Sequence, residues 1–166
     1  MASRPMWADA LLATAVAGSL LAIALLLERE EEVAGHLRII DGDTLAIDGR
    51  RIRIKGIDAP ELAQTCERAG AIQRCGETAR DALRALTEGA PVMCRVSGRD
   101  RWGRDLALCR ASGGDVGAAM VRQGLAVAFG GYEPEERDAR ARGVGVWAGT
   151  FETPSAWRKR HLPGSQ

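Results

Sequence analysis

A short pair of strands joined by Asp48-Gly49 constrains this chain more than any other feature. Residues 45–47 and 52–54 each alternate between the two sides of an extended chain, as half-buried strands do. The Asp-Gly dipeptide favours a type I′ turn, because both central residues of that turn need a positive φ. The sequence therefore predicts a tight hairpin in which Thr44 lies opposite Arg53.

Acidic residues stand directly before and after this hairpin. A hairpin brings its two ends together, so these carboxylates can converge in space. Hard oxygen ligands of this kind suit calcium or magnesium better than a thiophilic metal. A single acid in such a position is commonly a solvated turn residue, but the grouping, together with the arginines Arg53 and Arg104, favours a functional site. The acids are Asp41, Asp43, Asp58 and Glu61.

The remaining pattern predicts an α+β chain, mainly β, in which short strands form a small barrel decorated by helices. Helical spacing marks three segments, and each is bounded by a capping residue, a glycine or a proline. Two further strands flank a polar, glycine-bounded loop at residues 98–104. The expected helices are residues 78–86, 115–122 and 134–147, and the other expected strands are residues 37–39, 92–96, 106–108 and 125–129.

The chain has four cysteines, Cys66, Cys75, Cys94 and Cys109. An even count fits disulfides in an oxidising compartment, whereas zinc sites favour closer pairs, and free core thiols are the remaining alternative. We expect Cys66 to pair with Cys75, closing a short loop beside Glu61. We expect Cys94 to pair with Cys109, because the two lie nearly symmetrically about the residue 98–104 loop.

The first segment has the pattern of a membrane element. Residues 10–27 carry no charge and are rich in apolar residues, with Arg4 before them and an acidic run at residues 28–32 after them. That length just spans a bilayer, and the charge order leaves the amino terminus in the cytoplasm. A cleaved signal peptide is the rival interpretation, with Val33-Ala34-Gly35 as a weak cleavage site.

The body of the chain is mildly basic although the whole chain has a net charge of only +1. Residues 1–35 contain two arginines and five acids, so the other 21 basic and 17 acidic residues give residues 36–166 a net charge of +4. This charge is compatible with a nucleic-acid substrate and is too weak for tight, non-specific coating of DNA.

Five motifs, taken in order and spacing, make residues 37–150 resemble the staphylococcal nuclease (thermonuclease) family. This resemblance implies an OB-type five-stranded barrel with three helices. The motifs are Ile40-Asp41-Gly42-Asp43-Thr44, Arg53, Ile57-Asp58-Ala59-Pro60-Glu61, Asp100-Arg101-Trp102-Gly103-Arg104 and Val121-Arg122-Gln123-Gly124-Leu125-Ala126.

The resemblance also implies a calcium site. Asp43 and Asp58 match the carboxylates that bind calcium in the family, and Asp41 matches an acid just behind them. Ala59 matches a residue that contributes only its main-chain carbonyl, so alanine in place of the family's frequent threonine is compatible with binding. Glu61 matches the residue that orients or activates the attacking water.

Substrate contacts follow from the same resemblance. Arg53 and Arg104 match the pair that binds the phosphate, and Arg101 and Trp102 fall near the terminal phosphate of a bound nucleotide. Tyr132 matches a nucleotide-contacting tyrosine. Gly130 stands where a second tyrosine is expected, a departure that concerns base stacking and not the chemistry.

The sequence thus predicts a calcium-dependent nuclease that hydrolyses phosphodiester bonds in DNA or RNA and needs no obligate protein partner. The alternative is an inactive binding module or scaffold, tethered to the membrane through residues 10–27. We expect three regions: residues 1–35 as anchor and acidic linker, residues 36–152 as the nuclease-like domain outside the cytoplasm, and residues 153–166 as a basic, solvated tail onto which Trp157 can pack. If the signal is cleaved, the domain is secreted.

Overall fold

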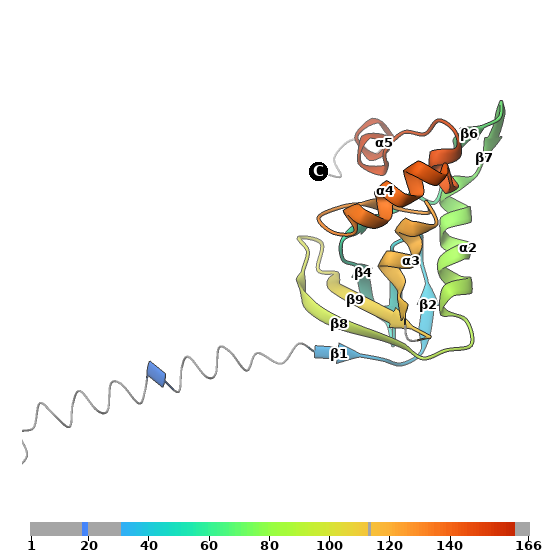
Figure 1. The fold of residues 1–166 in the computed structure, drawn as a ribbon. Helices are drawn as coiled ribbons and strands as arrows, with labels where there is room; N and C mark the ends of the chain where they lie inside the picture. Colours follow the sequence, from blue (N-terminus) through green and yellow to red (C-terminus); the bar gives the residue numbers. More distant parts are fainter. Residues whose placement is uncertain (1–17, 20–30, 113, 162–166) are drawn as a thin grey trace, which may run out of the picture. The chain divides into compact units, whose positions relative to one another are not determined.

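A computed structural model describes residues 18–19, 31–112 and 114–161 of the chain (Figure 1). The contacts divide the chain into residues 1–30 and residues 31–166, and all the elements below belong to the second unit. The expected membrane segment, residues 10–27, lies outside the described residues except for residues 18–19. Within the described ranges, no helix combines the length and the apolar character needed to cross a bilayer.

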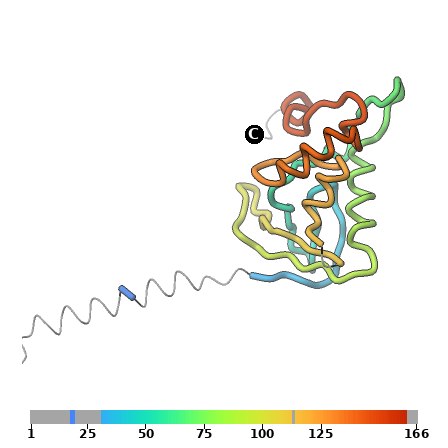
Figure 2. The backbone as a smooth tube through the Cα atoms, viewed as in Figure 1, coloured from blue at the N-terminus to red at the C-terminus, as the bar shows by residue number. Residues whose placement is uncertain are grey.

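The fold is mixed α+β and is built on a curled sheet of seven strands (Figure 2). Six of them follow the order β1-β8-β9-β4-β3-β2, and the seventh, β10, pairs with β9. All neighbours are antiparallel except β4 and β9, which are parallel. The strands are β1 (Glu31–Val33), β2 (Leu37–Ile39), β3 (Thr44–Ile47), β4 (Arg50–Ile54), β8 (Val92–Arg99), β9 (Asp105–Ala111) and β10 (Gly114–Asp115).

The predicted hairpin is confirmed. Strands β3 and β4 pair with Thr44 opposite Arg53, and the connecting residues Asp48 and Gly49 have φ values of +48° and +83°. Positive φ at both positions is what a type I′ turn requires, and glycine adopts it at no steric cost. The turn chemistry thus fixes the register that later places the acids at the hairpin ends.

Four helices are present in the described part of the chain, against the three expected. They are α2 (Cys75–Thr87), α3 (Val116–Arg122), α4 (Glu133–Arg142) and α5 (Pro154–His161), and a 3-10 helix, η1 (Gly145–Ala148), follows α4. Asp115 caps α3 by accepting a hydrogen bond from the backbone N–H of Ala118 at 2.8 Å. The expected helix at residues 134–147 is wrong in its second half, because Gly143 adopts a left-handed conformation and ends α4.

The core lies between the sheet and helices α2 and α3, which stand beside each other in Figure 1. Hairpin residues that alternate along β3 and β4 supply one side of it, and apolar residues at helical spacing supply the other. Its largest fully buried apolar side chains include Leu45, Ile47, Ile52, Ile54, Ile57, Leu83, Met120 and Val121.

Both predicted disulfides are confirmed. Cys94 and Cys109 are direct partners in the β8–β9 register, with their Cα atoms 4.1 Å apart. Cys66 and Cys75, with Cα atoms 5.8 Å apart, join a small hairpin to the first residue of α2. This hairpin consists of β6 (Cys66–Arg68) and β7 (Ala71–Gln73) and projects from the domain in Figure 1.

Strand β1 corrects the expectation that the acidic stretch before residue 36 is a linker. Glu31 to Val33 pair with β8, and the side chain of Val33 is 8% exposed. Glu31 forms an ion pair with Arg50, and Arg50 also bonds the buried carboxylate of Asp105 at 2.7 Å. The acidic composition alone did not predict a strand here. The strand forms because β8 offers an edge for pairing and Arg50 neutralises Glu31.

We predict that β1 stabilises the domain. A protein that begins at Gly35 should unfold at a lower temperature than one that begins at Glu31. Loss of Val33 burial, at about 1.5 kcal/mol, together with the Glu31 ion pair should lower the Tm by about 5–10 °C. Calorimetric unfolding of the two proteins measures this difference. A third protein, with Glu31→Gln in the longer chain, isolates the ion pair, and equal Tm values for both lengths would contradict the assignment.

Candidate active site

The two ends of the hairpin bring Asp43 and Asp58 to a single arginine. Arg53 donates from Nη1 to Asp43 Oδ1 at 2.7 Å and from Nη2 to Asp58 Oδ1 at 2.8 Å. Asp58 ends strand β5 (Ile57–Asp58), which pairs with β11 (Val127–Ala128). The long guanidinium side chain therefore reaches across to Asp43, which simple strand alternation places on the other face.

Asp43 is held by further donors. Its Oδ2 accepts from the backbone N–H of Ala59 at 3.0 Å, and its Oδ1 accepts from the Thr44 hydroxyl at 2.9 Å. Asp41, which is less buried than Asp43, accepts a hydrogen bond from the Asp43 backbone N–H at 3.0 Å. Burial raises the pKa of Asp43 to about 7, although the Arg53 guanidinium opposes this shift. The shift therefore reflects mainly the loss of water around the Asp43 carboxylate.

Gly42 allows the acidic turn to pack against the rest of the site. A Cβ atom at this position would lie 2.7 Å from the Cβ atoms of both Ala59 and Ala79. Those contacts are too short for any side chain, so glycine lets the turn, the Ala59 segment and helix α2 meet.

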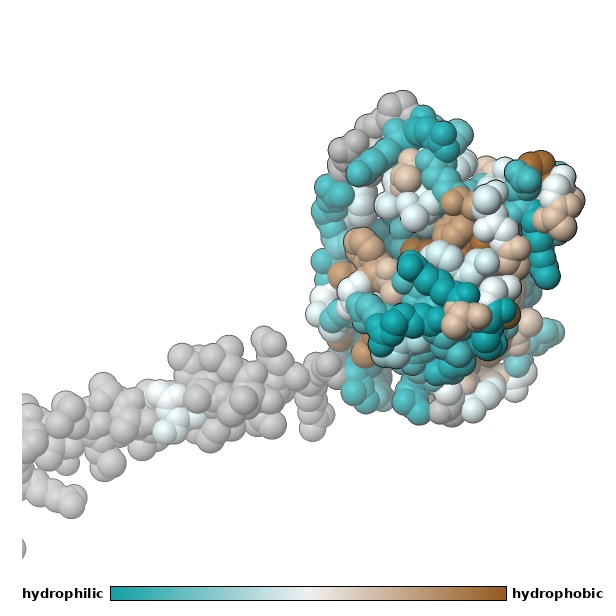
Figure 3. All heavy atoms as spheres, turned by 45° about the horizontal axis from the view of Figure 1, so that its top comes forward, coloured by the Kyte–Doolittle hydropathy of each residue, from teal (hydrophilic) through white to brown (hydrophobic). Residues whose placement is uncertain are grey.

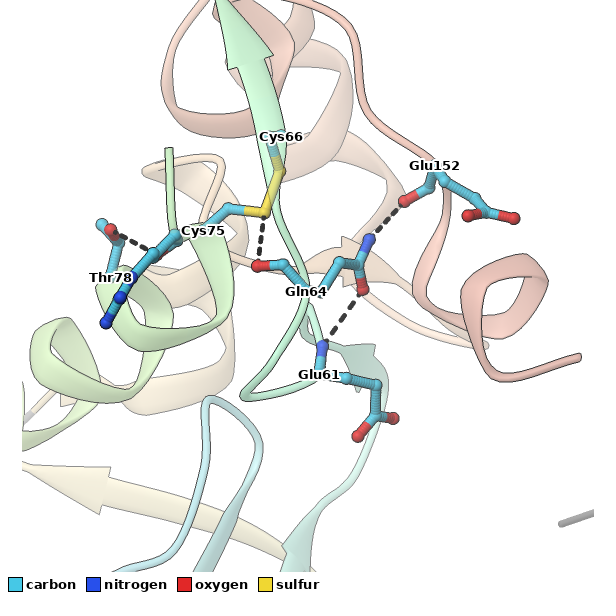
Figure 4. The surroundings of a disulfide bond; sticks show 7 residues. Glu61, Gln64, Cys66, Cys75, Thr78 and Glu152 are labelled. Atoms are coloured by element: carbon cyan, nitrogen blue, oxygen red, sulfur yellow. Dashed lines mark hydrogen bonds between the residues drawn. A yellow bond between two sulfur atoms is a disulfide. The ribbon is translucent and has the colours of Figure 1, made fainter. Parts of the chain in front are cut away.

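Glu61 is positioned by the start of α2 and by a buried glutamine (Figure 4). The Glu61 backbone N–H donates to Gln64 Oε1 at 3.1 Å, and Gln64 is fully buried. A Cβ on Gly76 would come within 1.8 Å of the Glu61 carbonyl oxygen, so the helix passes directly against this segment. The backbone of Glu61 is therefore held from two sides while its carboxylate lines the cleft.

Arg104 is held in its loop by Asp100. Asp100 Oδ2 accepts from Arg104 Nε at 2.7 Å, and Asp100 Oδ1 accepts from the backbone N–H groups of Trp102 and Arg104. Burial alone would raise the pKa of Asp100, but these hydrogen bonds outweigh it and lower the pKa. Asp100, which the sequence offered only as part of a motif, is therefore the residue that shapes the loop.

Asp41, Arg53, Glu61 and Arg104 line a cleft of about 720 Å³, whereas the buried Asp43 and Asp58 are not among its lining residues. Its lining is strongly cationic, with six basic side chains and two acidic ones, and it includes two exposed aromatic rings. The outer surface of this domain is otherwise mostly hydrophilic in the view of Figure 3, with small apolar patches between. The lining residues are Asp41, Arg51, Arg53, Glu61, Arg101, Trp102, Arg104, Phe129, Ser155, Arg158 and Lys159.

Trp102 and Phe129 are the aromatic rings of this cleft, with 57% and 65% of their surface exposed. The guanidinium of Arg101 lies 4.5 Å from the centre of the Trp102 ring, and that of Arg104 lies 5.2 Å from it. Phe129 was not among the predicted site residues, since a lone aromatic residue in a short strand is more often part of a core.

Tyr132 is not brought together with the other predicted site residues. Its hydroxyl lies 2.9 and 3.0 Å from the two carboxylate oxygens of Asp115, and it does not line the cleft. Burial, followed by the Asp115 carboxylate, raises the pKa of Tyr132. In this structure the tyrosine ties the cap of α3 to the start of α4, and a nucleotide contact for it stays a prediction.

The expected solvated tail is wrong for residues 154–161, which form helix α5. Arg158 donates from Nη1 to Asp58 Oδ1 at 3.0 Å and to Glu61 Oε1 at 2.8 Å, and from Nη2 to Asp58 Oδ2 at 3.0 Å. The basic run at residues 158–161 was the only signal in the sequence. A charge run by itself does not show that one of its members reaches a buried carboxylate 100 residues away.

The donor set fits a hard divalent cation. In residues 31–112 and 114–161 no three histidine, cysteine or acidic side chains cluster closely enough to form a metal site by themselves. The family's ligand set needs only two, because its third ligand is a main-chain carbonyl. Asp43 and Asp58 supply buried carboxylate oxygens that one guanidinium joins, and carboxylate oxygens are ligands that calcium and magnesium prefer.

Comparison with known proteins identifies the family. Residues 51–149 match the model of the family described as staphylococcal nuclease homologue. The matched region contains Arg53, Asp58, Glu61 and Arg104, and it spans more than half of the chain. The chain therefore belongs to the staphylococcal nuclease family.

Several curated relatives support this assignment. The chain is 38% identical over 136 residues to the succinoglycan biosynthesis protein ExoI of Rhizobium meliloti, covering 77% of this chain and 71% of the relative. It is 30% identical over 144 residues to an uncharacterized endonuclease of Haemophilus influenzae, covering 80% and 76%. The probable staphylococcal-like nuclease CAN1 of Oryza sativa is 30% identical over 131 residues, which cover 75% of this chain and 37% of the plant protein.

Proposed function

We propose that this protein is a calcium-dependent nuclease that hydrolyses phosphodiester bonds in DNA or RNA. The observation that carries the proposal is the convergence of Asp43 and Asp58 on Arg53, with Glu61 and Arg104 facing the same cationic cleft. The family membership and the relatives named as nucleases support it. In this proposal the curled sheet corresponds to the five-stranded OB-type barrel of the family.

Asp43, Asp58 and the carbonyl of Ala59 would hold the calcium ion, with Asp41 orienting Asp43 through its backbone N–H. When bound, the ion would neutralise a non-bridging phosphate oxygen and so lower the repulsion against an attacking nucleophile. The buried position of both carboxylates strengthens this binding, since few water molecules compete there. Alanine at position 59 is compatible with the role, because only its backbone oxygen is used.

Glu61 orients or takes the proton of the attacking water in this proposal. Its backbone is fixed by Gln64 and by α2, so the carboxylate approaches the cleft from a rigid support. Arg53 and Arg104 bind the equatorial oxygens, where charge gathers in the transition state. Planar guanidiniums do this with forked hydrogen bonds that lysine cannot reproduce.

The cleft also offers a path for the polynucleotide beyond the reacting phosphate. Arg101 and Trp102 stand at one side of the cleft lining, and the exposed ring of Phe129 contributes a second surface for base stacking. Stacking is tolerant of sequence, so this surface suits cleavage with little base specificity.

We further propose that the domain works outside the cytoplasm, held by residues 10–27 in the membrane. The two disulfides support an oxidising compartment for the domain. Strand β1 argues against the rival interpretation of a cleaved signal peptide. Cleavage near Val33-Ala34-Gly35 would cut β1, with its buried Val33, off from the rest of the domain.

The proposed ligand set predicts metal dependence. Cleavage of plasmid DNA and of RNA by the purified protein should require calcium and stop when a chelator is added. Magnesium should support less turnover, because it demands a smaller and stricter octahedral geometry. Gel analysis of cleavage, with calcium restored after chelation as the control, measures this dependence. Undiminished cleavage in excess chelator would refute the proposal.

The assigned roles predict distinct effects of substitution. Arg53→Ala and Arg104→Ala should each reduce turnover by about 10²-fold or more, the loss expected when one charge-stabilising donor is removed. Glu61→Gln should slow cleavage while calcium affinity stays nearly unchanged, whereas Asp43→Ala should weaken calcium binding itself.

Single-turnover cleavage and calcium titration of each variant separate these effects. Arg84→Ala, which removes an exposed arginine paired with Asp81 within α2, is the matched control and should cut like the parent. If the four site variants also cut like the parent, the assigned site is wrong.

A further inference from the structure

Helix α5 lies outside the region that matches the family, yet it sends Arg158 into the centre of the site. Three hydrogen bonds of 2.8–3.0 Å join Arg158 to Asp58 and Glu61. Both side-chain oxygens of Asp58 are engaged, since Oδ1 accepts from Arg53 and Arg158 and Oδ2 accepts from Arg158. The one carboxylate shared by the family's metal set and by α5 therefore accepts three hydrogen bonds from two guanidinium groups.

Hydrogen bonds from β6 and from Gln64 fix the segment that precedes α5. Thr150 exchanges two backbone hydrogen bonds with Glu67 in β6, at 2.9 and 3.0 Å. Gln64 donates from Nε2 to the Glu152 carbonyl at 2.7 Å while its Oε1 accepts from Glu61, as Figure 4 shows. One buried glutamine thus ties the segment before α5 to the residue that Arg158 contacts.

The Cys66–Cys75 disulfide completes this support. It links β6, which pairs with Thr150, to the first turn of α2, and Cys75 Sγ also lies 3.4 Å from the Gln64 carbonyl oxygen (Figure 4). The segment that precedes Arg158 is therefore held in place by hydrogen bonds and, through β6, by a disulfide.

A cation bound by Asp58 must compete with Arg158. Calcium lies 2.3–2.6 Å from its oxygen ligands, inside the 3.0 Å at which the guanidinium nitrogens approach both Asp58 oxygens. A cation at Asp58 would add a second positive charge beside the Arg158 guanidinium, and the repulsion between them would weaken the Arg158 hydrogen bonds. Arg158 and the cation therefore compete for the negative charge of Asp58.

We propose that α5 is an autoinhibitory latch, in which Arg158 occupies Asp58 and Glu61 until a divalent cation displaces it. The latch keeps the carboxylate of the metal set and the carboxylate of Glu61 neutralised together, so one event frees both. This inference rests on the proposed function, because it assumes that Asp58 is a calcium ligand.

Calorimetric titration of calcium chloride into the full-length protein in detergent micelles tests the latch. Arg158→Ala should bind calcium at least about tenfold more tightly than the parent, because charge-assisted hydrogen bonds no longer have to break. Arg158→Lys should fall between them, since lysine keeps the charge without the fork. Arg160→Ala is the matched control: Arg160 is in the same helix but pairs with Glu152, so its loss should leave the affinity within about twofold of the parent.

Hydrogen exchange of residues 154–161 in the unmodified protein gives a second readout that depends on no variant. Calcium should speed exchange in α5 if it releases the latch, and unchanged exchange at saturating calcium would overturn the proposal. Equal or weaker calcium affinity of Arg158→Ala would overturn it as well, and a simultaneous loss of nucleotide affinity would assign Arg158 to the substrate instead. In that case calcium-dependent cleavage by the parent would leave the proposed function standing, whereas absence of calcium binding in every protein would refute both.

Discussion

The interaction on which the site depends is the bridge that Arg53 makes between Asp43 and Asp58. Each of these carboxylates has lost nearly all its water, with exposed fractions of 4% and 2%. Burying such groups costs several kcal/mol per ion, and the cost is offset only if opposite charge and hydrogen bonds replace the water. Arg53 supplies both from the middle of β4, but it leaves the pKa of Asp43 raised. The fold thus holds two buried carboxylates together through one arginine.

Several local features of the fold hold the bridge and its surroundings in place. The turn at Asp48-Gly49 sets the register that aligns Arg53, and Gly42 lets the acidic turn contact α2. On the other side, Gln64 and the Cys66–Cys75 disulfide fix the segments that carry Glu61 and α5. Rigid support of this kind suits a site in which charge must be placed accurately before the substrate arrives.

The sequence predicted those parts of the molecule that depend on local chemistry. The hairpin, its Thr44–Arg53 register and both disulfides follow from turn preference and from spacing, and the structure confirms them. The parts that depend on distant partners were not predictable. Strand β1 exists because β8 offers an edge and Arg50 a counter-charge. The basic tail becomes α5 because Asp58 and Glu61, far away in the sequence, receive Arg158. The hydroxyl of Tyr132 likewise bonds a partner that is distant in the sequence, Asp115.

The central claim is that Asp43, Asp58 and the Ala59 carbonyl form a calcium site next to Arg53. The most direct measurement is a crystal structure of the protein soaked with calcium, in which anomalous scattering locates the ion. The account predicts one ion within about 2.3–2.6 Å of oxygens from all three residues. Calcium bound only elsewhere, with Arg53 still bridging two uncoordinated carboxylates, would contradict it.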